Sequence, residues 1–298
     1  MTQTPRTLYL VDSSIYIFRA WFILPSSIVC PRGEAVNALY GFADFLSQVT
    51  DQVSPSHLVC AFDRSLASSA RNKVYPAYKA NREPAPPELK RQFALCQSFA
   101  DKCGFAQFAS TDYEADDIIG TLVAVGRKNR YSNCILSADK DLAQFVGEKD
   151  MYWNFARKKR LDYRALQKQF GVQTHQIADM LAICGDKVDN IPGIPGVGAA
   201  TAAKLLVKWH DLDNLFDNVE AVASMKFRGA ARVSELLASY EETVRLARKL
   251  TGLWPVPDLP ESINALKRRK ADPTSLEQFM IKHGFGEQRR KRLLKSFC

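Results

Sequence analysis

A short stretch rich in glycine and proline constrains the fold of this chain more than any other feature. Four of the 15 glycines fall between Gly185 and Gly198, and two prolines interrupt the same stretch. Because proline removes a backbone donor and glycine favours turns, no helix can continue through it, and a hairpin loop is predicted. Residues 199–206 are rich in alanine and predict a helix. The backbone amides of residues 193–198 and the start of that helix together form a predicted phosphate-binding site.

Two carboxylates, Asp186 and Asp189, lie immediately before this loop. A separation of three residues at a turn lets both side chains face one divalent cation. The alternative is that residues 185–198 form an ordinary connector between two helices, as most isolated glycine and proline loops do. The carboxylates favour the first interpretation, which requires further acidic residues elsewhere in the chain.

The composition indicates a globular protein with a polyanionic partner. At 298 residues and 46% hydrophobic content, the chain can bury a sizeable core, in two domains or in one domain with a large appendage. It contains no apolar run of about 18 residues and no signal-peptide pattern, which predicts an intracellular protein without a membrane contact. The net charge of +9 favours the polyanionic partner, and the seven cysteines form no CxxC or zinc-binding pattern.

Three β-prone runs, at residues 7–11, 57–62 and 134–137, each lead into acidic residues. In an open α/β sheet the carboxyl ends of parallel strands share one edge, where ligands bind. A single aspartate after a strand is more often a helix cap or a turn residue, but three such positions in a basic chain favour a shared site. The aspartates concerned are Asp12, Asp63, Asp139 and Asp141.

A further acidic group lies at the start of a helix predicted within residues 112–122. Glu114, Asp116 and Asp117 cluster there and apolar residues follow. The helix dipole favours acids at this position, so capping accounts for one or two of them. Beside the strand-end aspartates, all three would repel one another by several kcal/mol unless divalent cations neutralise them. Hard oxygen ligands imply Mg²⁺ or Mn²⁺, and nine carboxylates in all imply two or more ions.

Basic and aromatic residues alternate over residues 71–82, between the second strand and the acidic helix. Cations suit the phosphates of a single nucleic-acid strand, and aromatic rings suit its bases. The alternative is a solvated, irregular loop. A proline-rich turn and a helix predicted at residues 88–100 follow.

Six motifs lie along the chain in a fixed order: LYLVDSS, CAFD, YKANR, YEADD, SADKD and GDKVDNIPGIPGVG. This order resembles that of the bacterial 5′–3′ exonucleases, which include the N-terminal nuclease domain of DNA polymerase I and the phage flap endonucleases. The resemblance covers nearly the whole chain. It implies a PIN-like 5′-nuclease core and, at residues 179–209, a helix–three-turn–helix similar to a helix-hairpin-helix.

The family's acidic positions are all present, and the resemblance implies how they are shared. One ion is expected at Asp63, Glu114, Asp116 and Asp139, the other at Asp139, Asp141, Asp186 and Asp189, with Asp12 and Asp117 acting through bound water. Residues 71–100 are the expected arch over the active site. Catalytic contacts to the scissile phosphate and the terminal base are expected from Tyr78, Lys79 and Arg82, with Arg19 as a further candidate. DNA contacts are expected from Gly193, Ile194, Gly196, Val197, Gly198, Thr201, Lys204 and Arg71, and the loop carbonyls are a candidate K⁺ site.

We therefore expect an α/β fold with a largely parallel central sheet flanked by helices. Residues 1–170 would form the catalytic domain, and residues 171–298 a helical DNA-binding subdomain. The predicted activity is structure-specific 5′–3′ exonuclease or flap endonuclease cleavage, through two metal ions, of DNA with a 5′ flap, a 5′ overhang or a frayed 5′ end. A cytoplasmic, nucleoid-associated monomer with a functional link to a DNA polymerase is expected. The alternatives are a PIN-type ribonuclease, which usually lacks the hairpin loop, and a DNA-binding module without activity.

Overall fold

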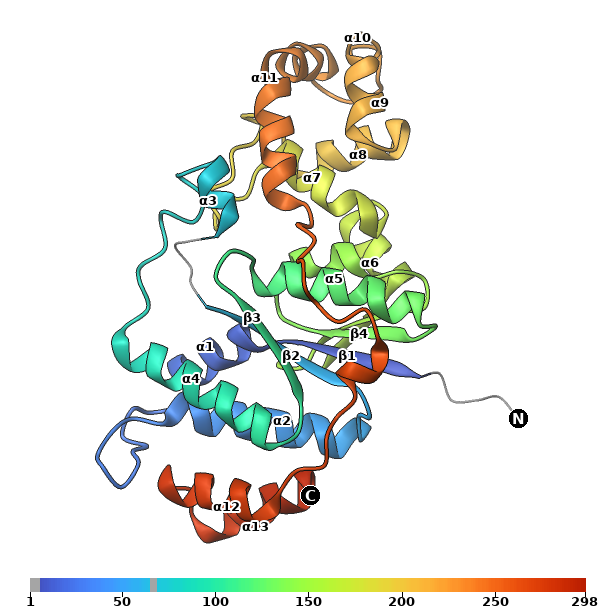
Figure 1. The fold of residues 1–298 in the computed structure, drawn as a ribbon. Coiled ribbons are helices and arrows are strands. Elements are labelled where there is room, and N and C mark those ends of the chain that lie inside the picture. Colours follow the sequence, from blue (N-terminus) through green and yellow to red (C-terminus); the bar gives the residue numbers. More distant parts are fainter. Residues whose placement is uncertain (1–5, 65–68) are drawn as a thin grey trace.

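The computed structural model describes residues 6–64 and 69–298. Its centre is a six-stranded sheet in the order β3-β2-β1-β4-β5-β6 (Figure 1). The pairs from β3 to β5 are parallel, and the described edge strand β6 pairs antiparallel with β5. This confirms the predicted fold class. The strands are β1 Thr7–Asp12, β2 Leu58–Asp63, β3 Ala106–Ser110, β4 Ser132–Leu136, β5 Met151–Asn154 and β6 Lys159–Asp162.

Helices cover both faces of the sheet, which explains why its central strands are almost continuously apolar. In β1, Leu8 and Leu10 point to one face and Val11 to the other, as the period of two requires. The first face is covered by α5 and the second by α1, α2 and α4 (Figure 1). These helices are α1 Ser13–Ile23, α2 Asn37–Val53, α4 Pro87–Lys102 and α5 Ala115–Lys128.

A helical region lies above α5 in Figure 1 and shares its apolar core. In it α7 packs between α8 and α11, and the glycine-rich loop joins α7 to α8. The prediction that no helix continues through this loop is confirmed. The elements are η1 Lys140–Phe145, α6 Tyr163–Phe170, η2 Thr174–Gln176, α7 Ile177–Cys184, α8 Ala199–Trp209, α9 Leu212–Asp217, α10 Val219–Val222 and α11 Ala230–Thr251, with the short α3 Ala70–Val74 beside them.

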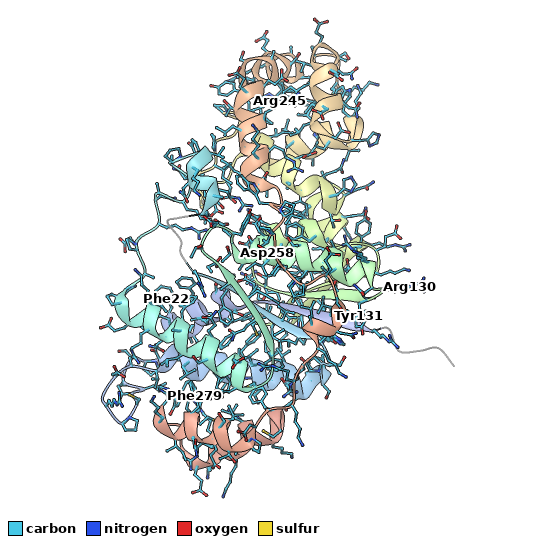
Figure 2. The ribbon with its side chains drawn as sticks, viewed as in Figure 1. Phe22, Arg130, Tyr131, Arg245, Asp258 and Phe279 are labelled. Atoms are coloured by element: carbon cyan, nitrogen blue, oxygen red, sulfur yellow. The ribbon has the colours of Figure 1, made fainter. Side chains whose placement is uncertain are left out.

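The C-terminal segment leaves this helical region and returns to the sheet. Residues 252–256 run along α5, and Lys267, directly after η3 (Ile263–Leu266), forms an isolated β-bridge with His57, directly before β2. The last two helices, α12 (Pro273–Lys282) and α13 (Glu287–Phe297), pack on α4 and α2. Figure 2 shows Phe279 of α12 and Arg245 of α11 at opposite ends of the molecule. Within the expected helical subdomain of residues 171–298, α12 and α13 thus pack apart from the other helices, and their apolar side chains complete the core beneath the sheet.

None of the helices in the described part of the chain has the length and apolar character that a membrane crossing requires.

Candidate active site

The central strands bring the predicted aspartates to one edge of the sheet. β1 ends at Asp12 and β2 ends at Asp63. Just after β4, the Ser137 hydroxyl donates to Asp12 Oδ2 at 2.7 Å and accepts from the backbone N–H of Asp139 at 2.9 Å. Asp63 Oδ1 accepts from the backbone N–H of Ala115, at the start of α5, at 2.8 Å. Four segments that are remote in sequence therefore meet at this edge.

Negative charge is crowded at this acidic edge. Burial, and then the charge of Asp63, raises the pKa of Asp12 to about 7. Burial, followed by the charges of Asp139 and Asp12, raises the pKa of Asp116 well above its ordinary value. Burial and the charge of Asp139 raise the pKa of Asp141 to about 7. A positive charge bound at this edge would lower these pKa values and favour the ionised carboxylates.

The donors at this edge fit a hard divalent cation, since they are carboxylate oxygens. Asp141 Oδ1 is buried and has no hydrogen-bond partner within the described structure, which leaves one acceptor for an ion. Within residues 6–64 and 69–298, no three acidic, histidine or cysteine side chains already stand close enough together to hold a metal ion. Glu114 and Asp189 are paired with two cations of the protein itself, Lys79 and Arg82.

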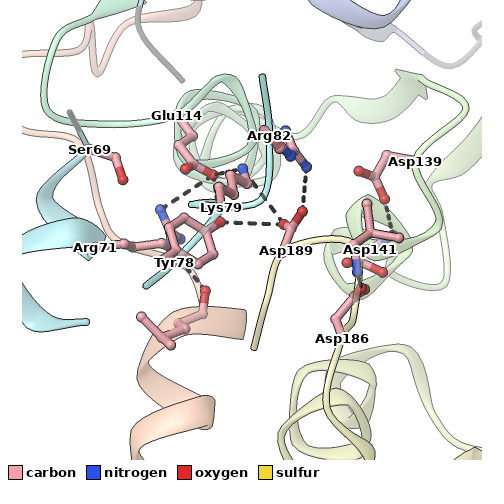
Figure 3. Close-up of polar contacts among 12 residues, drawn as sticks. Ser69, Arg71, Tyr78, Lys79, Arg82, Glu114, Asp139, Asp141, Asp186 and Asp189 are labelled. Carbon is pink, nitrogen blue, oxygen red and sulfur yellow. Dashed lines mark hydrogen bonds and ion pairs between the residues drawn. The ribbon is translucent and has the colours of Figure 1, made fainter. Parts of the chain in front are cut away.

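These cations come from the basic segment, residues 75–82, which is docked on the acids (Figure 3). Lys79 Nζ lies 2.7 Å from Glu114 Oε2, and Arg82 forms an ion pair with Asp189. The Tyr78 hydroxyl donates to Glu114 Oε2 at 3.1 Å. The backbone N–H of Lys79 donates to the Asp189 carbonyl at 2.9 Å. The alternative of a solvated, irregular loop is therefore wrong for this segment.

Because the basic segment packs against the acids, its side chains differ in how far they are exposed to solvent. The ring of Tyr78 is 3% exposed and the Lys79 side chain is 9% exposed, whereas Arg82 is about one-third exposed. In this conformation Tyr78 offers its hydroxyl, and its ring is not free to stack on a base. For Lys79 to contact a phosphate, its ion pair with Glu114 would first have to break.

The glycine-rich loop is closed on its inner side and open on its outer side. Backbone hydrogen bonds in both directions pair Asp186 with Ile191 at 2.7 and 3.0 Å. A Cβ on Gly193 would lie 2.2 Å from the Gly185 nitrogen, so only glycine fits there. At Gly196 and Gly198 a Cβ would meet nothing within 4 Å. This outer side can be approached closely by a ligand.

The other loop residues divide between core and surface. The side chains of Ile194 and Val197 are buried in the core, so only their backbone is available to a ligand. Lys204 is exposed on α8, and Thr201, also on α8, is partly exposed one turn earlier. This arrangement suits recognition of a phosphate backbone by main-chain atoms.

Arg71 is not placed for the expected DNA contact. It is 4% exposed, and it forms a bidentate ion pair with Asp117 at 2.5 and 2.8 Å. Asp117 is fully buried and caps the start of α5 reciprocally with Glu114. A buried guanidinium whose donors are taken by the protein cannot reach DNA, so the expectation for Arg71 is corrected. Both carboxylate oxygens of Asp117 already accept hydrogen bonds from Arg71 and from backbone N–H groups, which does not favour a metal ligand.

Arg19 lies away from the acids. Its exposed side chain lines a cavity of about 1000 Å³ between α1, α2 and the β5–β6 hairpin, together with Lys158 and Arg160. Spacing from Asp12 did not predict this direction, because Asp12 is the N-cap of α1 with an extended backbone and does not share the helical periodicity that sets the direction of Arg19.

Ser137 and Tyr152 were not predicted. Ser137 joins Asp12 to Asp139, and the Tyr152 hydroxyl donates to the Asp139 carbonyl at 2.9 Å. Ser137 had a usable signal, because it directly follows a strand and precedes the acids. Tyr152 had none, since its partner is brought close only by the pairing of β4 with β5.

An acidic edge, a basic segment docked on it and an open glycine-rich loop at a helix start together define a class of protein, the nucleases. Two family models match the chain. The model described as "5'-3' exonuclease, N-terminal resolvase-like domain" matches residues 7–171, and "5'-3' exonuclease, C-terminal SAM fold" matches residues 172–274.

Curated relatives agree with these models. A 5'-3' exonuclease of Aquifex aeolicus is 34% identical over 273 residues, which cover 92% of this chain and 90% of the relative. DNA polymerase I of Thermus thermophilus is 33% identical over 277 residues, which cover 93% of this chain and 32% of the polymerase. The chain thus spans about a third of the length of that polymerase.

Solved structures share the fold at low sequence identity. A T5 5'-exonuclease structure with zinc bound has a TM-score of 0.66 and 19% identity, with 98% of each chain covered. The catalytic core of Rad2 in complex with a DNA substrate has a TM-score of 0.66 and 14% identity, with 99% of this chain and 93% of the other covered.

The chain therefore belongs to the 5′–3′ exonuclease family. This confirms the resemblance drawn from the six motifs and identifies the protein as an enzyme of a family of metal-dependent 5′–3′ exonucleases and flap endonucleases.

Proposed function

We propose that this nuclease hydrolyses DNA at 5′ flaps, 5′ overhangs and frayed 5′ ends. The observation that carries the proposal is the docking of residues 75–82 on the acidic edge, next to the open glycine-rich loop. A duplex held at the loop and a single strand led past Lys79 and Arg82 would meet at the acids. Selection for a free or frayed 5′ end then follows from geometry and needs no reading of bases.

Two or more Mg²⁺ or Mn²⁺ ions are the proposed cofactors. Asp63, Glu114, Asp116, Asp139, Asp141, Asp186 and Asp189 are the proposed ligands, with Asp12 acting through bound water. Such ions lower the pKa of a bound water and stabilise the leaving oxygen in an in-line displacement. Lys79 and Arg82 supply positive charge to the scissile phosphate, and Tyr78 orients Glu114 through its hydroxyl.

The outer side of residues 193–198, with Thr201 and Lys204, is the proposed grip on the duplex. Amide donors at the start of α8 suit a phosphate, and the loop carbonyls suit a K⁺ ion. Binding should then fall when K⁺ is replaced by a larger organic cation at equal ionic strength, beyond the loss that salt causes by screening phosphates. A monomer that works with a DNA polymerase at the nucleoid is the proposed setting, supported by the bacterial polymerase relatives.

The test uses a 5′-flap DNA labelled on the flap. Asp139→Asn should reduce single-turnover cleavage in Mg²⁺ by about 100-fold or more, because it removes charge at the centre of the acids, while the duplex dissociation constant stays within about 2-fold. Asp217→Asn, on the exposed end of α9, is the matched control and should cleave normally. Near-normal turnover of Asp139→Asn would contradict the proposed site.

The same assay separates the two rival functions. A PIN-type ribonuclease would cleave an RNA flap faster than the DNA flap of the same sequence. A DNA-binding module without activity would bind the flap duplex and leave it intact at every concentration of Mg²⁺ or Mn²⁺.

A further inference from the structure

Arg71 and Asp117 form a buried pair in which both carboxylate oxygens and four of the five guanidinium N–H groups make hydrogen bonds. Besides the two bonds from Arg71, the Asp117 carboxylate accepts from the backbone N–H groups of Glu114 at 3.2 Å and Trp254 at 2.9 Å. Arg71 also donates to backbone carbonyls, from Nε to Leu250 at 2.9 Å and from Nη2 to Gly252 at 2.8 Å. We call these two side chains the Arg71–Asp117 pair.

The pair joins four segments that have no covalent link nearby. Arg71 belongs to α3, which directly precedes the basic segment, and Asp117 belongs to the start of α5. The two carbonyls belong to the end of α11 and its exit, and Trp254 to the linker that follows. Arg71 also lies over the Trp254 ring, with 5.3 Å between the guanidinium carbon and the ring centroid. A shift of any one segment must therefore disturb the others.

One side of the pair reaches the proposed reaction centre. Arg71 Nη1 lies 3.9 Å from Glu114 Oε2, the oxygen that Lys79 holds at 2.7 Å (Figure 3). The short turn from α3 to Lys79 is fixed by the Asn72 side chain, which donates to the Tyr78 carbonyl at 2.8 Å. The position of Lys79 therefore depends on where Arg71 holds α3.

The other side of the pair reaches the glycine-rich loop. α11, whose end Arg71 binds, packs along α7, the helix that enters the loop. The two helices are fastened by an ion pair between Arg248 and Asp179 and by the Thr251 hydroxyl, which donates to the Ala178 carbonyl at 2.9 Å. A duplex that changes the position of the loop would move α7 and α11 together, and Arg71 with them.

Arginine is required at this position by geometry. Its planar fork makes two parallel bonds to one carboxylate while Nε and Nη2 still reach two carbonyls. Lysine keeps the charge but has a single nitrogen, so it can hold Asp117 and must release the end of α11. Arg71→Lys therefore keeps the positive charge beside Asp117 and removes the hydrogen bonds to the end of α11.

We propose that the Arg71–Asp117 pair is a positioning pair that couples duplex binding at residues 193–198 to the placement of Lys79 and Arg82 for cleavage. The inference rests on the proposed function, since it takes the loop as the duplex grip. Neither side chain of the pair touches DNA. When the pair is broken, the protein should still bind the duplex and still cleave, but the rate of cleavage should no longer depend on the duplex.

The test compares two 5′-tailed DNAs, one with a long duplex arm and one whose arm is shortened until the parent protein binds it about 10-fold more weakly. In the parent, the long arm should also speed single-turnover cleavage at saturating protein by about 10-fold. In Arg71→Lys this gain in rate should fall below about 2-fold, while the gain in affinity stays. Arg127→Lys is the matched control, because Arg127 pairs with the buried Asp150 and with the Phe145 carbonyl, away from the basic segment.

Equal slowing of both DNAs by Arg71→Lys, with the ratio of rates unchanged, would overturn the coupling and leave a purely structural pair. A parent protein whose affinity does not depend on the arm would instead contradict the proposed function, and that is measured before any variant is made. If Arg71→Lys does not fold, hydrogen exchange on the parent decides. A blunt duplex without a tail should slow exchange of the amides of residues 70–82, and unchanged exchange there would overturn the proposal.

Discussion

Asp12 illustrates what it costs to bury a carboxylate among other carboxylates. Its residue is 5% exposed and its pKa is raised by burial and by Asp63 to about 7, whereas the unfolded chain returns it to about 3.9. The folded state therefore holds the proton more tightly than the unfolded state. In the absence of metal, ionisation of Asp12 lowers the free energy of unfolding as the pH rises from about 4 to 7.

Asp12→Asn should accordingly stabilise the protein in EDTA at pH 8, on the order of a few kcal/mol, because the amide has no charge and keeps an oxygen for the Ser137 hydroxyl. Thermal unfolding followed by circular dichroism measures this. The gain should shrink as the pH falls toward 4, where Asp12 is protonated in the folded state. A gain that is equal at pH 8 and pH 4 would point to packing instead of charge.

The residues of the acidic edge could be predicted because each follows a strand or opens a helix, and the ends of parallel strands meet. The Arg71–Asp117 pair could not. Its two members are 46 residues apart in sequence, and a buried arginine in a basic segment looks the same as an exposed one. The position of the Arg19 side chain could not be predicted for a related reason, since sequence distance from Asp12 does not give the direction of a side chain.

At the scale of elements, the loop between α7 and α8 was predictable from glycine and proline alone. The different structural role of each of its glycines was not. Gly185 and Gly193 lie back to back, and a side chain on either would strike backbone. Gly196 has a φ of +80°, which an L side chain rarely adopts. Gly198 has an ordinary φ of −90° and open space around it, so it alone among the four has no structural need of glycine.

Gly198→Leu is therefore a clean test of the duplex grip. The variant should fold with an unchanged melting temperature, and its dissociation constant for flap and plain duplex alike should rise by about 10-fold, because the side chain keeps DNA from the backbone amides. Gly286→Leu is the matched control, since Gly286 also precedes a helix of eleven residues and has nothing within 4 Å of its Cβ position. Parent-like affinity of Gly198→Leu, measured by fluorescence anisotropy, would show that the loop is only a connector.

At the scale of the whole molecule, the C-terminal helices could be predicted as elements but not placed. α12 and α13 are amphipathic, and an apolar stripe predicts that one face of a helix is buried but not which element buries it. The partner turned out to be α2 and α4, more than 170 residues earlier in the chain. Phe285, between the two helices, is 1% exposed, and its ring centroid lies 4.2 Å from that of Tyr40. The Tyr40 hydroxyl also bonds to the Gly284 carbonyl.

If these helices serve the core and not the DNA, then Phe285→Ala should separate stability from binding. Loss of a buried ring should lower the free energy of unfolding by about 3–5 kcal/mol, measured in urea, because the surrounding rings cannot collapse fully into the cavity. The dissociation constant for flap DNA, measured well below the midpoint temperature, should stay within about 2-fold of the parent, since the acids lie at the ends of the strands whereas Phe285 packs in the core over one face of the sheet. Phe22→Ala is the control for loss of a ring as such, because Phe22 is 78% exposed and should change neither quantity. Weakened DNA binding by Phe285→Ala without loss of stability would return α12 and α13 to the DNA-binding part of the molecule.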